Sequence, residues 1–313
     1  MSLSATRRHD GAPHLGDPAL LAVLVTASAA VARLDAAAAL HPLLRALLHR
    51  ARLDAARHQA AADGHPLDPW HLAAALEGLP LRAMRDSELA MDAGAIYDAA
   101  RLALDYHGWL VAPGFDAEGE IRAALAALVG ERPYGVPLLD AAWGAWLWLE
   151  RGGTRPPLRA ALVRRWGTAG LLRAPLPLTG AAALGPDQPW EPRLWIPAFL
   201  RAVAAEAGAV LDLLLEMERR WLAARAKVAA GRRRNSRAPA AVDLLAAVPL
   251  VSATTLAAAL GLSVKAACGI LDDLVRLEVS VEVTHRHSRR LFGLAGLAPL
   301  RAAAAPPRRP VPG

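Results

Sequence analysis

The sequence predicts a mainly α-helical protein, and three observations support this prediction. Alanine, leucine and arginine are good helix formers, and they dominate a chain that is 54% hydrophobic but only 5% aromatic. Apolar residues recur at helical spacing along most of the chain. Runs of Val, Ile, Thr and Tyr at period two, which would indicate strands, are almost absent. The length of 313 residues is enough for two domains with a hydrophobic core.

Helices are predicted wherever apolar residues share one face between prolines and glycines. Asp17 and Pro18 are typical of a helix start, because aspartate caps the first N–H groups and proline fits the first turn. The predicted helices span residues 18–35, 41–62, 69–78, 92–111, 117–130, 137–151, 157–170, 191–225 and 240–247. Residues 173–192 contain so many prolines that we expect a long loop there, with one turn inside it.

The bulk composition favours a cytoplasmic protein with an anionic partner. The formal net charge of +7 favours nucleic acid first and a membrane surface second. Only Lys227 and Lys265 are lysines among the 36 basic residues, so a general preference for arginine explains the excess about equally well. The single cysteine, Cys268, excludes an intrachain disulfide and a Cys-x-x-Cys site, and it fits a reducing cytoplasm.

Residues 18–32 are apolar, but they do not favour a signal peptide or a membrane span. Asp10 and Asp17 lie where a signal peptide would be basic, and the apolar run is too short to cross a bilayer. We therefore expect the start of a buried helix and no association with a membrane.

A basic segment is predicted to divide the chain. Residues 219–237 carry eight basic residues and no acidic one, and Gly231 suggests a hinge within them. The predicted division is a flexible arm (1–16), a helical domain (17–227), a basic linker (228–238), a C-terminal domain (239–298) and a disordered tail (299–313). The linker is interpreted either as a solvated connection or as a contact to phosphates.

Two short helices around Gly261 predict a helix-turn-helix. Ser252 can cap a helix that ends at Leu260, and Gly261 should stop it because only glycine adopts the left-handed conformation at little cost. Ser263 can cap the second helix. The residues expected to bury the two helices are Leu256, Ala257, Leu260, Ala267, Ile270, Leu271, Leu274 and Leu277. This spacing is typical of a helix-turn-helix, although helical hairpins with a glycine turn are common.

A basic hairpin is predicted directly after this helix pair. Residues 279–283 form the most strand-like run, residues 291–294 can return as a second strand, and the turn 284–290 between them is polar and basic. A helix-turn-helix with such a hairpin is a winged helix-turn-helix. The predicted nucleic-acid-binding residues are Ser263, Lys265, His285, Arg286, His287, Arg289, Arg290, Arg232, Arg233 and Arg234. The hairpin would contact phosphates or a minor groove.

The second helix of the pair offers little for direct base reading. Lys265 is the one good base or phosphate reader on its exposed face, and Asp272 and Asp273 would repel a DNA backbone that they faced. We therefore expect binding that is salt-sensitive and poorly sequence-specific. The alternative is that the helix pair packs on the front domain or forms a dimer contact.

No metal, cofactor or catalytic site is predicted from motifs. His285 and His287 are two residues apart, but no third ligand lies near them. The sequence has no glycine-rich nucleotide loop and no zinc-protease or nucleophile-elbow motif. The nine tryptophans are interpreted as core residues.

As a whole, the chain resembles bacterial proteins that join a domain of unknown function to a C-terminal helix-turn-helix domain. These in turn are similar to Fic-fold proteins that have lost their catalytic motif. The resemblance lies in "HLAAALEGLPL" (71–81), "LRAALVRRWGTAGLLRAPLPLTG" (158–180), "DQPWEPRLWIPAFLRAVAAEA" (187–207) and the helix-turn-helix. It covers most of residues 18–298 without a strict signature, and it implies a Fic-like helical bundle in front of the winged helix-turn-helix.

The resemblance also implies that catalysis has been lost. Fic enzymes transfer a nucleotide or another phosphate-containing group to a hydroxyl, and they use a His-Pro-Phe-x-Asp-Gly-Asn-Gly-Arg loop whose histidine is the base. When the family's last arginine is set on Arg159, the base falls at Trp148. The asparagine falls at Thr154 and the first arginine at Pro156. Tryptophan cannot accept a proton from a hydroxyl, so the loop keeps only Arg155 and Arg159 as candidates for phosphate binding at a helix start.

The segment around Glu77 resembles the inhibitory helix of Fic proteins. Glu77 and Gly78 match it, whereas Ala73 stands in place of the family's hydroxyl. Because Pro156 leaves no arginine to pair with, Glu77 is expected to end a helix through a local contact, and Gly78 is expected to be a left-handed stop.

Together these observations predict a non-enzymatic, cytoplasmic protein that regulates transcription. Its expected partner is double-stranded DNA, a homodimer is left open, and neither a cofactor nor a membrane is expected. Two alternatives remain. One is a degenerate nucleotide-binding or nucleotidyl-transfer protein, and the other is a scaffold for protein interactions that does not bind DNA.

Overall fold

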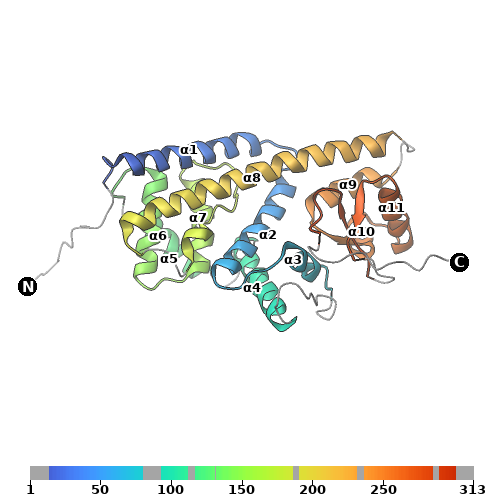
Figure 1. Cartoon of the computed structure of the whole chain (residues 1–313), viewed down its shortest axis with the longest axis horizontal. Coiled ribbons are helices and arrows are strands. Elements are labelled where there is room, and N and C mark those ends of the chain that lie inside the picture. Colours follow the sequence, from blue (N-terminus) through green and yellow to red (C-terminus); the bar gives the residue numbers. More distant parts are fainter. Residues whose placement is uncertain are drawn as a thin grey trace, which may run out of the picture. The chain divides into compact units, whose positions relative to one another are not determined.

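The computed structural model describes residues 14–79, 93–111, 117–130, 132–185, 190–230, 236–284 and 289–300. Helices make up 71% of the structure, and the strands form one small sheet (Figure 1). The prediction of a mainly α-helical fold is therefore confirmed. The predicted arm, the tail beyond residue 300 and the tip of the predicted hairpin lie wholly or largely outside the described residues.

The observed helices match the predicted ones to within about one turn at each end. The helices are α1 (Pro18–Ala38), α2 (Leu44–Ala62), α3 (Pro69–Leu76), α4 (Ala93–Val111), α5 (Ala117–Gly130), α6 (Pro137–Glu150), α7 (Arg155–Thr168), the 3-10 turn η2 (Ala181–Leu184), α8 (Pro192–Ala229), α9 (Ala238–Ala247), α10 (Ala253–Leu260) and α11 (Val264–Arg276). The strands are β1 (Val251–Ser252), β2 (Ser280–Glu282) and β3 (Leu291–Leu294). As predicted, Asp17 caps α1, and Pro18 is its first residue.

The chain forms two compact units that differ from the predicted domains. Unit 1 comprises Met1–Ala39 and Tyr106–Leu211, and unit 2 comprises Leu40–Asp105 and Asp212–Gly313. The helices α2 and α3 therefore belong with the C-terminal segment rather than with a continuous front domain. Sequence periodicity shows which face of a helix is buried, but it does not show which distant segment covers that face.

Unit 1 is built around α5, which packs against α6 and α7. Its core contains large aromatic side chains, and Trp143, Trp166 and Trp195 are almost fully buried, as expected for core tryptophans. Trp190 differs from this expectation because 47% of its surface is exposed. The centroid of its ring lies 6.2 Å from the ring centroid of Trp146.

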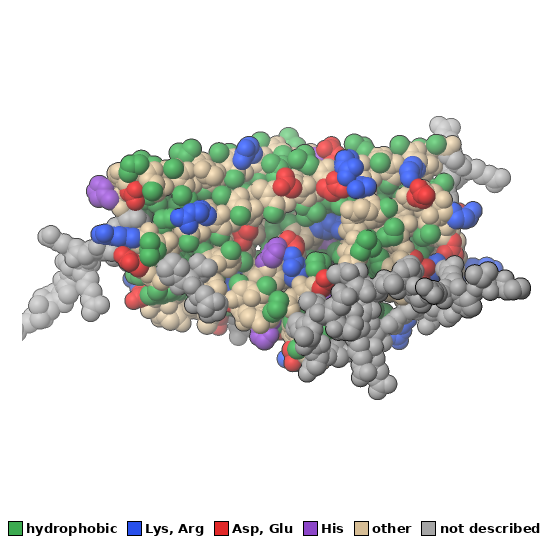
Figure 2. Space-filling model, in the orientation of Figure 1, with side chains coloured by type: hydrophobic (Ala, Val, Ile, Leu, Met, Phe, Trp, Pro, Cys, Tyr) green, Lys and Arg blue, Asp and Glu red, His purple; other side chains and the backbone are tan. Residues whose placement is uncertain are grey.

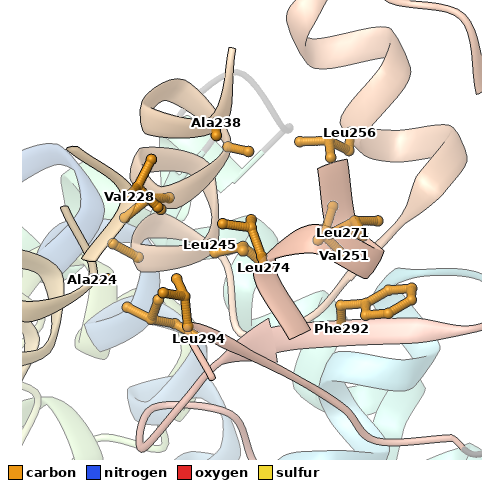
Figure 3. Packing of buried hydrophobic residues seen from close by; sticks show 14 of the residues in the cluster. Ala224, Val228, Ala238, Leu245, Val251, Leu256, Leu271, Leu274, Phe292 and Leu294 are labelled. Atoms are coloured by element: carbon orange, nitrogen blue, oxygen red, sulfur yellow. The ribbon is translucent and has the colours of Figure 1, made fainter. Parts of the chain in front are cut away.

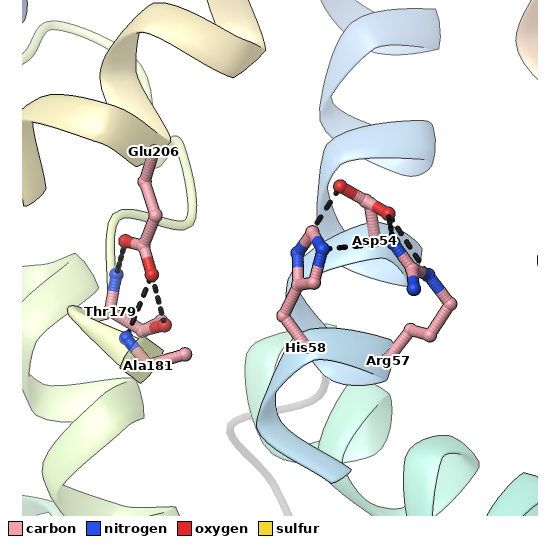
Figure 4. A network of polar contacts seen from close by, with 6 residues as sticks. All are labelled: Asp54, Arg57, His58, Thr179, Ala181 and Glu206. Carbon is pink, nitrogen blue, oxygen red and sulfur yellow. Dashed lines mark hydrogen bonds and ion pairs between the residues drawn. The ribbon is translucent and has the colours of Figure 1, made fainter. Parts of the chain in front are cut away.

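A carboxylate from α8 closes the loop before η2 (Figure 4). Glu206 accepts hydrogen bonds from the backbone N–H groups of Thr179 at 2.6 Å, Gly180 at 2.9 Å and Ala181 at 2.8 Å. Burial raises the pKa of Glu206, and the three backbone donors partly offset this effect. Gly180 has a φ of +66°, and a Cβ there would lie 2.4 Å from the ring of Phe199, so only glycine fits this turn.

Unit 2 has a core that joins α8, α9, α11 and the sheet (Figure 3). Both ends of the predicted linker lie in it, because Val228 is only 1% exposed and Ala238 is fully buried. The segments at these two ends are therefore packed helix rather than solvated linker. Gly231 and the three arginines that follow it lie outside the described residues.

Among the described residues, α1 is long and apolar enough to cross a membrane, and the bent pair of α10 and α11 passes the same test. In unit 1, α1 buries one stripe that includes Leu20, Ala27 and Leu34. Its opposite face is open, with Val25 65% exposed. The prediction of a buried helix thus holds for one face only.

Leu271→Ala should lower the free energy of unfolding by about 2 to 5 kcal/mol, because it leaves a cavity in the core of unit 2. Urea unfolding followed by circular dichroism measures this change. Leu222→Ala is the matched control, since Leu222 is 52% exposed and its truncation should change the free energy by less than about 0.5 kcal/mol. Equal losses in the two variants would contradict the described core.

Candidate nucleic-acid interface

The two short helices α10 and α11 meet at a sharp bend of 111°. Ser252 Oγ caps α10 by accepting from the N–H of Thr255, and Ser263 Oγ caps α11 by accepting from the N–H of Ala266. Gly261 ends α10 with a φ of +64°. All three features were predicted from the sequence and are confirmed.

Small side chains let the two helices pack closely. Ala257 is 4% exposed and Ala267 is fully buried, and Leu271 and Leu274 continue the buried face of α11. The expectation that Leu277 is buried is wrong, because α11 ends at Arg276 and Leu277 is 38% exposed.

The three strands form an antiparallel sheet in the order β1-β3-β2. Val251 lies opposite Phe292 in one pair, and Ser280 lies opposite Leu294 in the other. Both predicted strands are present. The strand β1 was not predictable from the sequence, because two residues are too few to show a period-two pattern.

The predicted hairpin joins β2 to β3, and its base is ordered by further hydrogen bonds. The N–H of Val283 donates to the Leu291 carbonyl at 2.9 Å, and the N–H of Leu291 donates to Thr284 Oγ1 at 3.0 Å. His285, Arg286 and His287, all predicted to bind nucleic acid, lie outside the described residues.

The first turns of α11 present a solvent-exposed surface with mostly small side chains. Ser263, Lys265 and Gly269 are exposed, and Val264 is 49% exposed. Arg289, at the other end of the hairpin turn, is also exposed. Three of the predicted nucleic-acid-binding residues, namely Ser263, Lys265 and Arg289, are therefore accessible to a partner.

Arg290 is held differently from its neighbour. Its guanidinium binds Glu282 of β2 at 2.8 Å and Asp272 of α11 at 2.9 Å. It also lies 4.8 Å from the ring centroid of Phe292. The hydrogen bond to Glu282 is the largest cause of the raised pKa of Arg290. The side chain thus ties the hairpin to α11, which differs from the expected direct contact with a phosphate.

The two aspartates that were expected to repel DNA each have a cationic partner. Asp272 binds Arg290, and Asp273 binds Arg276 within α11. Both carboxylates are therefore ion-paired, but Asp272 shares Arg290 with Glu282, so this group of three side chains keeps one net negative charge.

Basic residues of α8 near the predicted linker are mostly paired. Arg219 and Arg220 bind Glu216, and Arg225 binds Asp243 at 2.6 Å. On the face shown in Figure 2, the described basic side chains are scattered, and several lie beside acidic ones. The arginines 232–234 lie outside the described residues, so their predicted contacts with nucleic acid stay predictions.

A pocket of about 540 Å³ lies in unit 1, between α5 and the end of α6 with the loop that follows it. Small residues of α5 line one side, and Trp148, Arg151, Gly152 and Gly153 line the other. Trp148 Nε1 donates to the Thr154 carbonyl at 2.8 Å. A Cβ on Gly153 would lie 2.2 Å from the indole, so glycine is required beneath this ring.

The two arginines proposed for phosphate binding do not share this pocket. Arg159 is fully buried, and its guanidinium lies 5.2 Å from the ring centroid of Tyr106. Arg155 is half-buried at the first position of α7. The expectation for Arg159 is therefore corrected: its side chain is a core residue, because α7 turns that face inward.

Within the described ranges, no group of three His, Cys, Asp or Glu side chains could hold a metal ion. His285 and His287 fall outside those ranges.

Comparison with models of known protein families and with curated protein sequences finds no match. The similarity to Fic-fold proteins therefore stays an expectation from the sequence.

Arg290→Ala should lower the free energy of unfolding by about 1 to 2 kcal/mol, between the values typical of exposed and buried ion pairs. The reason is that Glu282, whose side chain is only 9% exposed, would lose its cationic partner. Thermal and urea unfolding measure this loss. Arg289→Ala removes an exposed arginine next to it and should change stability by less than about 0.5 kcal/mol. The same small effect for both variants would show that Arg290 does not anchor the hairpin.

Proposed function

We propose that residues 236–300 form a winged helix-turn-helix that binds double-stranded DNA, and that the protein regulates transcription. The single observation that carries the proposal is the element order α9-β1-α10-α11-β2-β3 with its sheet order β1-β3-β2. The bend of 111° between α10 and α11 falls in the range of about 90 to 120° typical of helix-turn-helix pairs.

The exposed start of α11 suits a groove of DNA. In helix-turn-helix proteins the first residues of the second helix contact base edges. Lys265 can bind guanine or phosphate, and the apolar Val264 and Ala266 can contact thymine methyl groups. Gly269 leaves room for close approach, since a Cβ there would meet no atom within 4 Å.

Most of the affinity is expected to come from phosphate contacts. Arg289 can contact the DNA backbone while α11 occupies the groove. Few side chains of α11 can read bases, so we expect modest sequence specificity and strong dependence on salt. The exposure of Lys265 and Arg289 leaves both cations accessible to a phosphate backbone.

No catalytic role is proposed for unit 1. Trp148 stands where the Fic resemblance places the base, and its one ring nitrogen is a donor only, which binds the Thr154 carbonyl.

One observation favours nucleotide binding as a second candidate function. The pocket beside Trp148 combines an indole face with the Arg151 side chain, and these groups can stack on a base and bind a phosphate. Of the two arginines expected to bind phosphate, Arg159 is buried and Arg155 does not line this pocket, so this candidate ranks second.

Binding of a mixed-sequence duplex, measured by fluorescence anisotropy, should weaken steeply as salt is raised. Lys265→Ala and Arg289→Ala should each weaken binding several-fold and reduce the slope of log affinity against log salt by about one, as expected for loss of one phosphate contact.

Arg201→Ala is the matched control, because it removes one exposed arginine from α8 in unit 1. It should leave affinity and slope unchanged. Absence of duplex binding by the full chain at low salt would refute the proposed function.

If the second candidate is correct, calorimetry should detect ATP binding that Arg151→Ala weakens about tenfold, the equivalent of one charge-assisted hydrogen bond. Arg201→Ala again serves as the control. No heat of binding at millimolar-range ATP would remove this candidate and leave the DNA proposal untouched.

A further inference from the structure

Two charged side chains from the first half of unit 2 reach the short corner between α9 and α10. The helix α9 ends at Ala247 and α10 begins at Ala253, with β1 between them. Arg50 of α2 and Glu77, which caps the end of α3, both bind groups of this corner. All these residues belong to unit 2.

The guanidinium of Arg50 is surrounded by backbone carbonyls and is 7% exposed. Its Nε donates to Ala246 at 2.6 Å, and its Nη2 donates to Leu245 at 2.9 Å and to Val248 at 2.7 Å. Its Nη1 donates to Leu297, after β3, at 3.2 Å. The first three acceptors lie at the end of α9, where carbonyls lack helical partners and the helix dipole is negative. Burial lowers the pKa of Arg50 to about 10, so the side chain stays charged at neutral pH.

Three charged residues near the end of α2 differ from Arg50, because they form local ion pairs. Arg57 binds Asp54 at 2.8 Å, and His58 lies 3.4 Å from the same carboxylate (Figure 4). These pairs join successive turns of one helix. Arg50 instead donates its hydrogen bonds to carbonyls at the end of α9 and in the segment after β3.

Glu77 completes the cap of α10 from a distant part of the chain. Its Oε2 accepts from the N–H of Ser252 at 3.0 Å and from Thr255 Oγ1 at 2.7 Å. In an ordinary capping box, a Glu or Gln at the third helical position binds the N–H of the cap residue. Thr255 occupies that position here, and Glu77 supplies the carboxylate across 175 residues. The expected local contact of Glu77 is therefore wrong, because the acceptor is used between α3 and α10. Gly78, with a φ of +67°, is the predicted left-handed stop.

We propose that Arg50 and Glu77 are positioning residues that hold the α9-β1-α10 corner against α2 and α3 and so fix how α11 is presented to DNA. The DNA part of this inference rests on the proposed function. Each charge is opposite to the dipole of the helix end that it contacts. Because α11 follows α10 after only the turn Gly261–Ser263, a displaced α10 would carry α11 with it.

A distance measurement tests the positioning without DNA. Cys268 of α11 is the only cysteine, and Arg45 is exposed on α2, so spin labels at Cys268 and at an introduced Arg45→Cys report the separation of these helices. Pulsed electron paramagnetic resonance on the full chain should give one narrow distribution. Arg50→Gln and Glu77→Gln should each broaden or shift it, whereas Glu278→Gln, at a highly exposed position, should not. Unchanged distributions in both variants would overturn the proposal.

Duplex binding by the same variants separates positioning from stability. Arg50→Gln and Glu77→Gln, verified as folded by circular dichroism, should bind a mixed-sequence duplex about tenfold more weakly, with a salt slope reduced by about one. A purely stabilising role would lower the active fraction but leave the affinity and slope of that fraction unchanged, and this result would overturn the proposal.

Arg50→Lys covers the case in which Arg50→Gln does not fold, because lysine keeps the charge but cannot reproduce the fork of donors. Arg50→Lys should show smaller changes of the same kind in the distance distribution and in duplex binding. Wild-type values in both measurements would contradict the proposal. If the unmodified protein binds no duplex, the proposed function fails. The distance measurements would still decide whether Arg50 and Glu77 hold the corner.

Discussion

The buried guanidinium of Arg50 is the constraint on which the architecture of unit 2 depends. A charge removed from water is costly unless hydrogen bonds replace its hydration, and here four backbone carbonyls do so. Those carbonyls belong to α9 and to the segment after β3, whereas the charge belongs to α2. These three parts of the chain must therefore stay together, and α9 also contributes to the hydrophobic core of unit 2.

The local structure of this protein could be predicted well from the sequence, because local signals determine it. Gly261, Ser263 and Asp17 specify their helix ends through conformational freedom or a side-chain cap, and each of them needs only its neighbours to act. Two strands and nearly every helix follow from periodicity in the same way. The winged helix-turn-helix interpretation draws on these local elements and on their order.

The long-range structure could not be predicted, and Arg50, Glu77 and Arg159 show why. In the sequence each of them resembles an ordinary polar residue at a helical position. The residues next to it in the sequence do not indicate that its partner lies far along the chain. Arg290 belongs to the same class, since a basic hairpin turn gives no sign that one of its arginines binds Asp272 and Glu282. Of the candidate site, the exposed positions at Ser263, Lys265 and Arg289 were predictable, and the internal ion pairs were not.

The two units share an interleaved connectivity: each is assembled from two separate stretches of the polypeptide. During synthesis, α2 and α3 leave the ribosome long before α9 to α11 exist, so their apolar and charged groups must wait for partners made last. Such delayed closure exposes surfaces that favour aggregation or chaperone binding in a growing chain. The hydrophobic core of the C-terminal segment lies within residues 224–294, but two of the charged side chains that hold it, Arg50 and Glu77, are encoded far upstream.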